Sequence, residues 1–493
     1  MTSLWLDVLR PIPTDDFEPL ASYDDVIVGA GLTGLVTALL FARRGHTVAV
    51  LEAGTVGGLA TGSSSGLVSL LQGAQLQKIR QRTYQGVVDA YAEGSREAFS
   101  WLLDYTEGAG VDVERRDAYS YATTRRGLER VDSEYFVGRR AGLDLVKTLK
   151  VDVPFNTLGA VRLRDQAQLD PRELVAALAA DVRALGGIIV ENAHVTGVEA
   201  GDPATTHTSQ GDVRSERVHL TTGAPILDRG LYFAKTTPRR SLGMAFSGVD
   251  DDDLPGALYR SVDAPSRSIR RHRGDLIVSG NTHGTGRAAS ETALAQDLED
   301  WTTAHWPAAR RRRAWSGQDY ATLHGVPFVG FLPRGRGRVF VATGYDSWGM
   351  TNAVSAARML VADVIGDDSP WMTTLHHRVT LPAAIGWGLG ANAAVAWHFA
   401  RGWTKALATP VSAGELPGEG EGVVGSEGLS PVARSTVAGE SCALSAVCPH
   451  LGGIVSWNDQ ESTWDCPLHG SRFTPRGEVI EGPATRGMTP RPL

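Results

Sequence analysis

A glycine-rich turn near the N-terminus constrains the fold of this 493-residue chain more than any other feature of its sequence. Residues 26–34 read VIVGAGLTG, an apolar stretch that runs into three glycines with the spacing GxGxxG. A helical stretch follows, and a second apolar stretch then ends at Glu52. Strand, glycine turn, helix, strand and acidic residue in this order are typical of a βαβ unit that binds a dinucleotide.

Each residue of this motif has a physical role in holding a dinucleotide. Gly29 permits the tight turn, Gly31 lets the backbone approach the pyrophosphate, and Gly34 lets the helix pack closely on the strand. The positive end of the helix attracts the phosphate charge. The carboxylate of Glu52 can accept hydrogen bonds from both ribose hydroxyls and would repel a 2′-phosphate. The motif therefore predicts a Rossmann-type domain that binds FAD or NAD.

Composition limits the remaining possibilities. The length predicts about three domains, and the contents of 42% hydrophobic and 21% charged residues are those of a globular protein. A net charge of -7 gives no sign of a nucleic-acid partner. All three cysteines fall in the last tenth of the chain, which excludes a disulfide framework and favours a local metal or redox site. The N-terminus lacks a signal-peptide pattern, so we expect a cytoplasmic protein.

Two segments rich in small residues favour FAD over NAD. Residues 60–69 read ATGSSSGLVS, and their small side chains would let the backbone run close beneath a flat ring system. Residues 341–352 read VATGYDSWGMTN, which predicts a strand, a glycine turn and the start of a helix. The N-terminus of that helix could stabilise negative charge on a reduced flavin.

Together with residues 220–223 (LTTG) and 315–330 (WSGQDYATLHGVPFVG), these segments resemble the D-amino-acid-oxidase and glycine-oxidase (DAO) superfamily of FAD enzymes over about residues 23–365. The resemblance implies that FAD is the cofactor. It also implies which residues would contact FAD: Gly29, Gly31, Leu32, Thr33, Gly34, Glu52, Ala53, Thr61, Ser63, Ser64, Gly66, Leu67, Val195, Thr222, Gly223, Gly344, Gly349, Met350 and Thr351. The family commonly has an acidic residue at the position of His324, so we assign that histidine no role.

The resemblance further implies that a second, mainly β domain is inserted into the FAD-binding domain and covers the flavin. The expected fold class is therefore α/β (α+β), a Rossmann-type FAD-binding domain with an inserted mixed-sheet substrate domain, followed by a small all-β domain. The expected ranges are an N-terminal arm (1–22), an FAD-dependent oxidoreductase (23–370), a helical linker (371–410) and the β domain (411–493). Within the oxidoreductase we expect FAD-binding parts at about 23–75, 151–225 and 311–370, and substrate-domain parts at about 76–150 and 226–310.

Candidate catalytic residues come from the expected substrate domain. Arg270, like Arg267, could bind a substrate carboxylate in a bidentate manner. Tyr259 or His283 could orient an amine. These positions rest on residue type and approximate location alone.

A second motif lies at the C-terminus. Cys448-Pro-His450 and Cys466-Pro-Leu-His469 form the pattern C-x-H-x15-C-x2-H. Two Cys and two His could hold zinc, but zinc fingers group their cysteines before their histidines. One Cys and one His in each loop suit a Rieske [2Fe-2S] cluster, in which one iron takes two thiolates and the other two imidazoles. The pattern therefore predicts such a cluster.

Residues 416–493 resemble Rieske domains in general, and the resemblance assigns the four ligand roles directly. Respiratory-type Rieske loops carry an additional disulfide, but this chain has Gly453 and Leu468 at those positions. Cys442 cannot replace that pair, and we expect it to be a buried structural thiol.

A long apolar segment precedes the β domain. Residues 381–403 contain one formal charge, Arg401, and would be long enough to span a bilayer. Three glycines, an asparagine and a histidine favour a linker helix packed on the protein surface, so we expect no stable membrane insertion.

Two redox motifs in one chain suggest an internal electron relay. The hypothesis is that an amine or amino acid is oxidised at a C–N bond by FAD, and that electrons pass singly through the Rieske cluster to an external acceptor such as a ferredoxin-like protein, a quinone or oxygen. The alternatives are the reverse electron flow, from an external donor through the cluster to the flavin, and a redox sensor or electron-transfer protein without a substrate. A Rieske oxygenase is disfavoured because no two-histidine, one-carboxylate iron site is evident.

Overall fold

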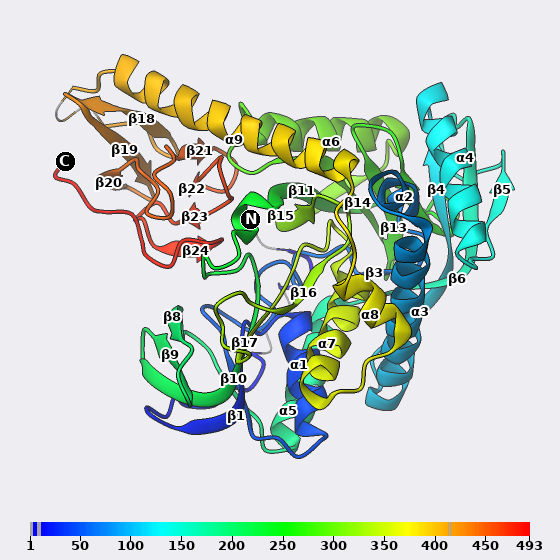
Figure 1. The fold of residues 1–493 in the computed structure, drawn as a ribbon. Coiled ribbons are helices and arrows are strands. Elements are labelled where there is room, and N and C mark those ends of the chain that lie inside the picture. The colour runs from blue at the N-terminus through cyan, green and yellow to red at the C-terminus, as the bar shows by residue number, and fades with distance from the viewer. Residues whose placement is uncertain (1–2, 7–10, 413, 415) are drawn as a thin grey trace.

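An eight-stranded sheet carries the N-terminal glycine motif in the computed structural model, which describes residues 3–6, 11–412, 414 and 416–493 (Figure 1). The order along its main path is β16-β17-β10-β1-β2-β7, and β8 and β9 extend it beside β10. The central strands are parallel, which requires crossover connections and helices on the sheet faces. The strands are β1 (Ser22–Val28), β2 (Val48–Leu51), β7 (Ile188–Val190), β8 (Val195–Glu199), β9 (Ala204–Thr208), β10 (Gly211–Gly223), β16 (Phe328–Phe331) and β17 (Val339–Thr343).

A second sheet of nine strands forms the adjoining domain. Its order is β15-β11-β14-β13-β12-β4-β6-β3, with β5 beside β6, and its pairs are antiparallel except for β4 and β12. The strands are β3 (Leu67–Val68), β4 (Val113–Ala122), β5 (Val146–Thr148), β6 (Gly159–Leu169), β11 (Thr236–Ser247), β12 (Leu258–Ser261), β13 (Arg267–His272), β14 (Asp275–Gly284) and β15 (Arg310–Thr322).

Helices bury the apolar faces of these sheets. α1, α5 and α7 contribute to one hydrophobic core with the parallel sheet, and α2, α3, α4 and α8 surround part of the second sheet (Figure 1). The helices are α1 (Leu32–Ala42), α2 (Gln75–Arg82), α3 (Gln85–Ala109), α4 (Arg125–Arg140), α5 (Pro171–Ala184), α6 (Glu291–His305), α7 (Gly349–Ile365), α8 (Pro370–His376) and α9 (Pro382–Ala408), with the short 3-10 helix η1 (Tyr232–Ala234).

The C-terminal residues form a small all-β unit, as predicted. It has one three-stranded and one four-stranded antiparallel sheet. Helix α9 runs along an outer edge of the molecule and leads into this unit (Figure 1). Within the described residues, no helix meets the length and apolarity that a bilayer span requires. The strands are β18 (Gly422–Glu427), β19 (Ser430–Val437), β20 (Glu440–Ser445), β21 (Ser456–Asn458), β22 (Thr463–Asp465), β23 (Arg472–Phe473) and β24 (Val479–Glu481).

Strand pairing divides the oxidoreductase differently from the ranges drawn on the sequence. β6 and β15 fall within ranges expected to bind FAD, but both strands belong to the nine-stranded sheet. The chain passes between the two sheets several times, and apolar periodicity identifies a strand without identifying its partner. Hydrogen-bond pairing therefore sets the domain boundary.

Candidate functional site

The glycine turn has no space for larger side chains. A Cβ atom on Gly34 would lie 1.9 Å from the Gly29 carbonyl oxygen, and Gly29 itself has a φ of +104°. α1 begins after Gly31, which has no side chain to cap it, and the amide of Leu32 at the start of the helix donates to Thr61 Oγ1 at 3.1 Å. A Cβ on Gly31 would lie 3.2 Å from Thr61 Oγ1, so only a glycine leaves the helix end accessible. The turn thus has the bare backbone, next to a helix N-terminus, that a pyrophosphate requires.

Glu52 lies at the end of β2, beside this turn. Its buried carboxylate accepts hydrogen bonds from the backbone amides of Ala30, at 2.8 Å, and Gly54, at 2.9 Å. Burial raises the pKa of Glu52, and the two amide hydrogen bonds oppose that effect. A carboxylate has lone pairs left after two such bonds, so it can also accept the hydroxyls of a ribose.

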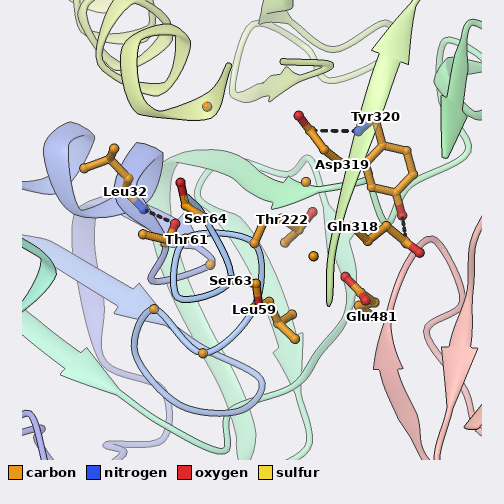
Figure 2. Close-up of a pocket in the computed structure, with 18 of the residues that line it drawn as sticks. Leu32, Leu59, Thr61, Ser63, Ser64, Thr222, Gln318, Asp319, Tyr320 and Glu481 are labelled. Carbon is orange, nitrogen blue, oxygen red and sulfur yellow. Dashed lines mark hydrogen bonds between the residues drawn. The ribbon is translucent and has the colours of Figure 1, made fainter. Parts of the chain in front are cut away.

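A long cavity connects this turn with the nine-stranded sheet and with the C-terminal β unit. Figure 2 shows the loop of residues 59–64 on one side of it and residues 318–320 of β15 on the other. The N-terminus of α7 also faces the cavity through Gly349 and Met350, and no side chain caps that helix. The glycine turn before α1, the uncapped N-terminus of α7 and a floor of small residues fit FAD, with its pyrophosphate and its electron-rich reduced ring.

Most residues predicted to contact FAD lie together in this cavity. Those that line it are Gly29, Gly31, Leu32, Thr33, Glu52, Ala53, Thr61, Ser63, Ser64, Val195, Thr222, Gly223, Gly349 and Met350. Five others do not line it: Gly34, Gly66, Leu67, Gly344 and Thr351. Their positions support the wall instead. For example, Thr351 Oγ1 accepts a hydrogen bond from Gln72, and Gly344 packs against Thr322.

None of the three predicted catalytic residues lines the cavity. Tyr259 is buried on the opposite face of the sheet, where its ring stacks on Tyr119. Arg270 is buried and its guanidinium donates to Gln168 Oε1 at 3.1 Å. His283 has its Nε2 atom 3.1 Å from Glu291 Oε1. Arg267, the other arginine considered, donates to Asp297 at 2.8 Å.

The cavity presents other polar residues, from β12 and β15. Arg260 lines it, although its neighbour Tyr259 does not, because successive side chains of a strand point to opposite faces. Gln318, Asp319 and Tyr320 line it from β15 (Figure 2). Strand alternation predicts that Tyr259 and Arg260 point to opposite faces, but the sequence alone does not indicate which face of β12 lines the cavity.

The four predicted cluster ligands lie together at the ends of two adjacent loops. The rings of His450 and His469 are 5.2 Å apart, and Cys448 and Cys466 are both buried. The two thiols share a proton: the neighbouring Cys466 lowers the pKa of Cys448, and the same contact together with burial raises the pKa of Cys466. Cys448 is therefore the sulfur that more readily becomes a thiolate, and iron bound to both sulfurs would take the place of the shared proton.

The histidine atoms also fit a metal centre. Among the described residues His469 Nδ1 is buried without a hydrogen-bond partner, and burial lowers the pKa of His469 to about 4, which leaves its ring neutral. His450 Nε2 lies 2.9 Å from Asp228 Oδ1, an arrangement that leaves Nδ1 as the free nitrogen of that ring. An orphaned ring nitrogen and a stabilised thiolate are what a Rieske cluster requires.

The loops close without the additional disulfide of respiratory-type Rieske domains. A Cβ on Gly453 would lie 2.5 Å from Leu468 Cδ1 and 3.2 Å from Cys466 Sγ, so the leucine side chain fills the space beside the cluster loops. Cys442 is half-buried on β20, which corrects the expectation of a buried thiol. It lies at the pairing of β20 with β19, opposite Ser435, and not within the cluster loops.

A buried charge network joins the two parts of the molecule. The guanidinium of Arg240, on β11, is buried and contacts Glu461 and Glu481 of the β unit, the latter at 3.4 Å. Arg472 lies 2.7 Å from the same Glu481. His283 belongs to this contact through Glu291, which is 3.8 Å from Arg240. Paired and hydrogen-bonded charges of this kind fix an interface geometry because a displaced partner would be left buried and uncompensated.

Gly34→Ala should abolish FAD binding, because the new methyl group would overlap the Gly29 carbonyl and push the turn away from α1. The measurement is the FAD content of the purified variant, read from its visible absorption. Gly108→Ala is the matched control, since the same methyl group meets nothing within 4 Å there. Full FAD content in Gly34→Ala would contradict this account of the turn.

The fold and the two sites define an oxidoreductase that uses FAD and a [2Fe-2S] cluster. A family model for FAD dependent oxidoreductases (DAO) matches residues 24–363, and a model for Rieske [2Fe-2S] domains matches residues 413–491. The chain therefore belongs to the DAO family of FAD-dependent oxidoreductases and carries a C-terminal Rieske domain.

Relatives match the whole chain or one of its two parts. The Rieske 2Fe-2S iron-sulfur protein YhfW of Bacillus subtilis is 29% identical over 477 residues, which cover 94% of this chain and 92% of that one. Glycine oxidase of Bacillus licheniformis is 24% identical over 70% of this chain and 94% of its own. The crystal structure of glycine oxidase from Geobacillus kaustophilus has the same fold, with a TM-score of 0.61 and 20% identity over 71% of this chain and 96% of that chain.

Proposed function

We propose that this protein oxidises the C–N bond of an amino acid or related amine and passes the electrons through the Rieske cluster to an external acceptor. Bound FAD would supply two-electron oxidation, and the cluster would supply one-electron transfer to a ferredoxin-like protein, a quinone or oxygen. The glycine oxidase relatives support oxidation at a C–N bond. The hydrolysis of an imine product would need only water.

One contact carries the proposal of a relay. The Rieske domain forms part of the wall of the FAD cavity through residues 479–482 and Ala484. Gln318 lines that cavity and its Nε2 donates a hydrogen bond, at 2.8 Å, to the carbonyl of Gly470, the residue that follows the ligand His469. A single side chain thus touches both the cavity and a cluster loop.

The Gln318 side chain is held in this position from both ends. Its Oε1 accepts a hydrogen bond from Thr285 at 2.8 Å, and its Nε2 also lies 2.8 Å from Tyr320 Oη. Figure 2 shows the bond to Tyr320 and the nearby side chain of Glu481. The contact between the two cofactor sites is therefore built into the folded domain interface.

Two arginines could bind a substrate carboxylate. Arg239 and Arg260 both line the cavity. Within the part of the chain that the structure describes, neither has a carboxylate within ion-pair distance, whereas Arg240, Arg267 and Arg472 are all paired. Arg260 is the better placed of the two because it is half-buried, and burial lowers its pKa, so a bound carboxylate would compensate a desolvated charge.

Asp319 could accept the proton that an ammonium substrate must lose before its nitrogen lone pair is available. It lines the cavity, and its carboxylate accepts hydrogen bonds from the backbone amides of Tyr320, at 2.7 Å, and Ser347. Burial raises the pKa of Asp319 to about 7. The basic, deprotonated form therefore becomes dominant as the pH rises through about 7.

We accordingly expect kcat/KM to rise with pH up to a pKa of about 7. Asp319→Asn should lose this rise and lower kcat/KM by about 100-fold, the lower end of what general bases contribute. The measurement is the pH profile of kcat/KM for both forms. A substrate amine that ionises at higher pH leaves its own inflection in both profiles, so persistence of the inflection near 7 in Asp319→Asn would contradict the assignment.

The experiment that tests the function is anaerobic mixing of the holoenzyme with a panel of amino acids and amines. A true substrate should bleach the flavin absorption without any other reductant, and the carbonyl product, at two electrons per molecule, should account for the electrons found in the reduced flavin and the reduced cluster together. If none of the panel bleaches the flavin, but a reduced external donor reduces the cluster and then the flavin, electron flow is the reverse of that proposed.

A further inference from the structure

Helix α9 exposes an apolar face along most of its length. The exposed fractions are 68% for Leu389, 63% for Trp397, 62% for Trp387, 50% for Ile385 and 41% for Phe399. At 3.6 residues per turn, Ile385, Leu389, Trp397 and Phe399 share one side of the helix, and we call these four residues the α9 face; Trp387 lies at its edge, toward α2. A helix that is apolar all round is normally buried on every side. Here one side of α9 packs on the protein, the helix runs along an outer edge of the molecule (Figure 1), and the residues of the α9 face are exposed.

The segment of sequence that contains this face has basic residues but no acidic ones. The chain has no Asp or Glu between Asp368 and Glu415, although its net charge is -7. Arg401 and Lys405 are exposed near the C-terminal end of α9. On the neighbouring helix α2, Arg82 places its guanidinium 4.5 Å from the ring centroid of Trp387. The surface therefore combines apolar side chains with positive charge.

The dimensions of the face disfavour a second copy of the chain as its partner. A helix of 27 residues is about 40 Å long and about 10 Å wide, so the face offers roughly 400 Å². Two copies would bury roughly 800 Å², whereas stable protein interfaces bury at least about 1,200 Å². A bilayer has no such minimum area. Tryptophans edged by arginine and lysine are typical of helices that lie in the interface of an anionic membrane.

We propose that the α9 face binds the surface of an anionic lipid bilayer, with α9 lying in the membrane plane. This surface goes beyond the reaction proposed above and does not depend on its substrate. The face continues to a cluster loop: the ring of Phe399 is 6.3 Å from that of Trp403, and Trp403 Nε1 donates to the Gly452 carbonyl at 3.0 Å. Membrane binding therefore brings the cluster loop close to the lipid headgroups.

The test is flotation of the holoenzyme with vesicles of phosphatidylcholine, with and without phosphatidylglycerol. The wild type should float with the vesicles that contain phosphatidylglycerol, and added salt should weaken its binding. Leu389→Glu and Trp397→Glu should each lower the partition coefficient by at least about tenfold, because each removes apolar contact and adds repulsion from the lipid. Unchanged FAD and cluster absorption establishes that the variants are folded.

The matched control is Leu149→Glu, which makes the same change at a leucine that is 82% exposed and lies far from α9 in the sequence. It should float like the wild type. The proposal is wrong if the wild type fails to float with vesicles of either lipid mixture. It is also wrong if Leu149→Glu loses as much vesicle binding as Leu389→Glu. It is also wrong if light scattering finds a dimer that Leu389→Glu dissociates while no form binds vesicles, because the face then belongs to a second copy.

Discussion

Cys466→Ser should leave the flavin reducible by substrate but abolish electron delivery to a one-electron acceptor. The serine cannot replace the buried thiolate that completes the ligand set, so the cluster should be lost from the purified protein. Turnover with the one-electron acceptor should fall by at least about 100-fold. This is the upper end of the loss of activity that follows when residues that only support metal ligands are changed, and here a ligand itself is removed. The measurements are iron content, the rate of anaerobic flavin bleaching and the steady-state rate with acceptor.

Cys442→Ser provides the control for that experiment. It makes the same chemical change at a half-buried cysteine that lies on β20, away from the cluster ligands, so iron content and turnover should remain close to those of the wild type. If Cys466→Ser loses its iron but transfers electrons to the acceptor as fast as the wild type, the cluster is not on the path.

Arg260→Met should raise KM for an amino-acid substrate by about 100-fold, because it leaves a substrate carboxylate desolvated and without its charged partner. Methionine fills a similar volume without the charge, and Arg260 has no ion-pair partner among the described residues, so the fold should tolerate the change. The measurements are KM and kcat from the initial rates of flavin-dependent turnover.

The control for Arg260→Met is a substrate amine that lacks a carboxylate. The variant and the wild type should have similar KM values for such an amine, since no ion pair is removed. An equal loss with both kinds of substrate would indicate that Arg260 supports the cavity wall and does not recognise the carboxylate.

The two cofactor motifs could be predicted from sequence because each lies within a short segment whose residues depend on local geometry. Gly34 is required by a carbonyl five residues away, and Cys448 and His450 lie two residues apart in one loop. Such spacings are set by backbone geometry and survive any rearrangement of the surrounding fold. The fold class and both cofactors were accordingly predicted correctly.

The substrate-facing residues could not be predicted in the same way, because their positions depend on strand pairing and on which face of the sheet is covered. Tyr259 and Arg260 are neighbours in sequence, but they lie on opposite faces of β12. Asp319 and Gln318 gain their environment from segments far away, including the Rieske domain. No short sequence pattern indicates that the C-terminal domain forms part of the wall of this cavity.

The central claim is that electrons pass from substrate, by way of the flavin, to the cluster of the same molecule. The most direct measurement is anaerobic rapid freeze-quench of the holoenzyme with its substrate, with flavin absorption and the electron paramagnetic resonance signal of the reduced cluster recorded at several protein concentrations. We predict that the cluster signal follows flavin bleaching at a rate independent of protein concentration. Complete flavin bleaching with a cluster that stays oxidised, or that is reduced at a rate proportional to protein concentration, would contradict the internal relay.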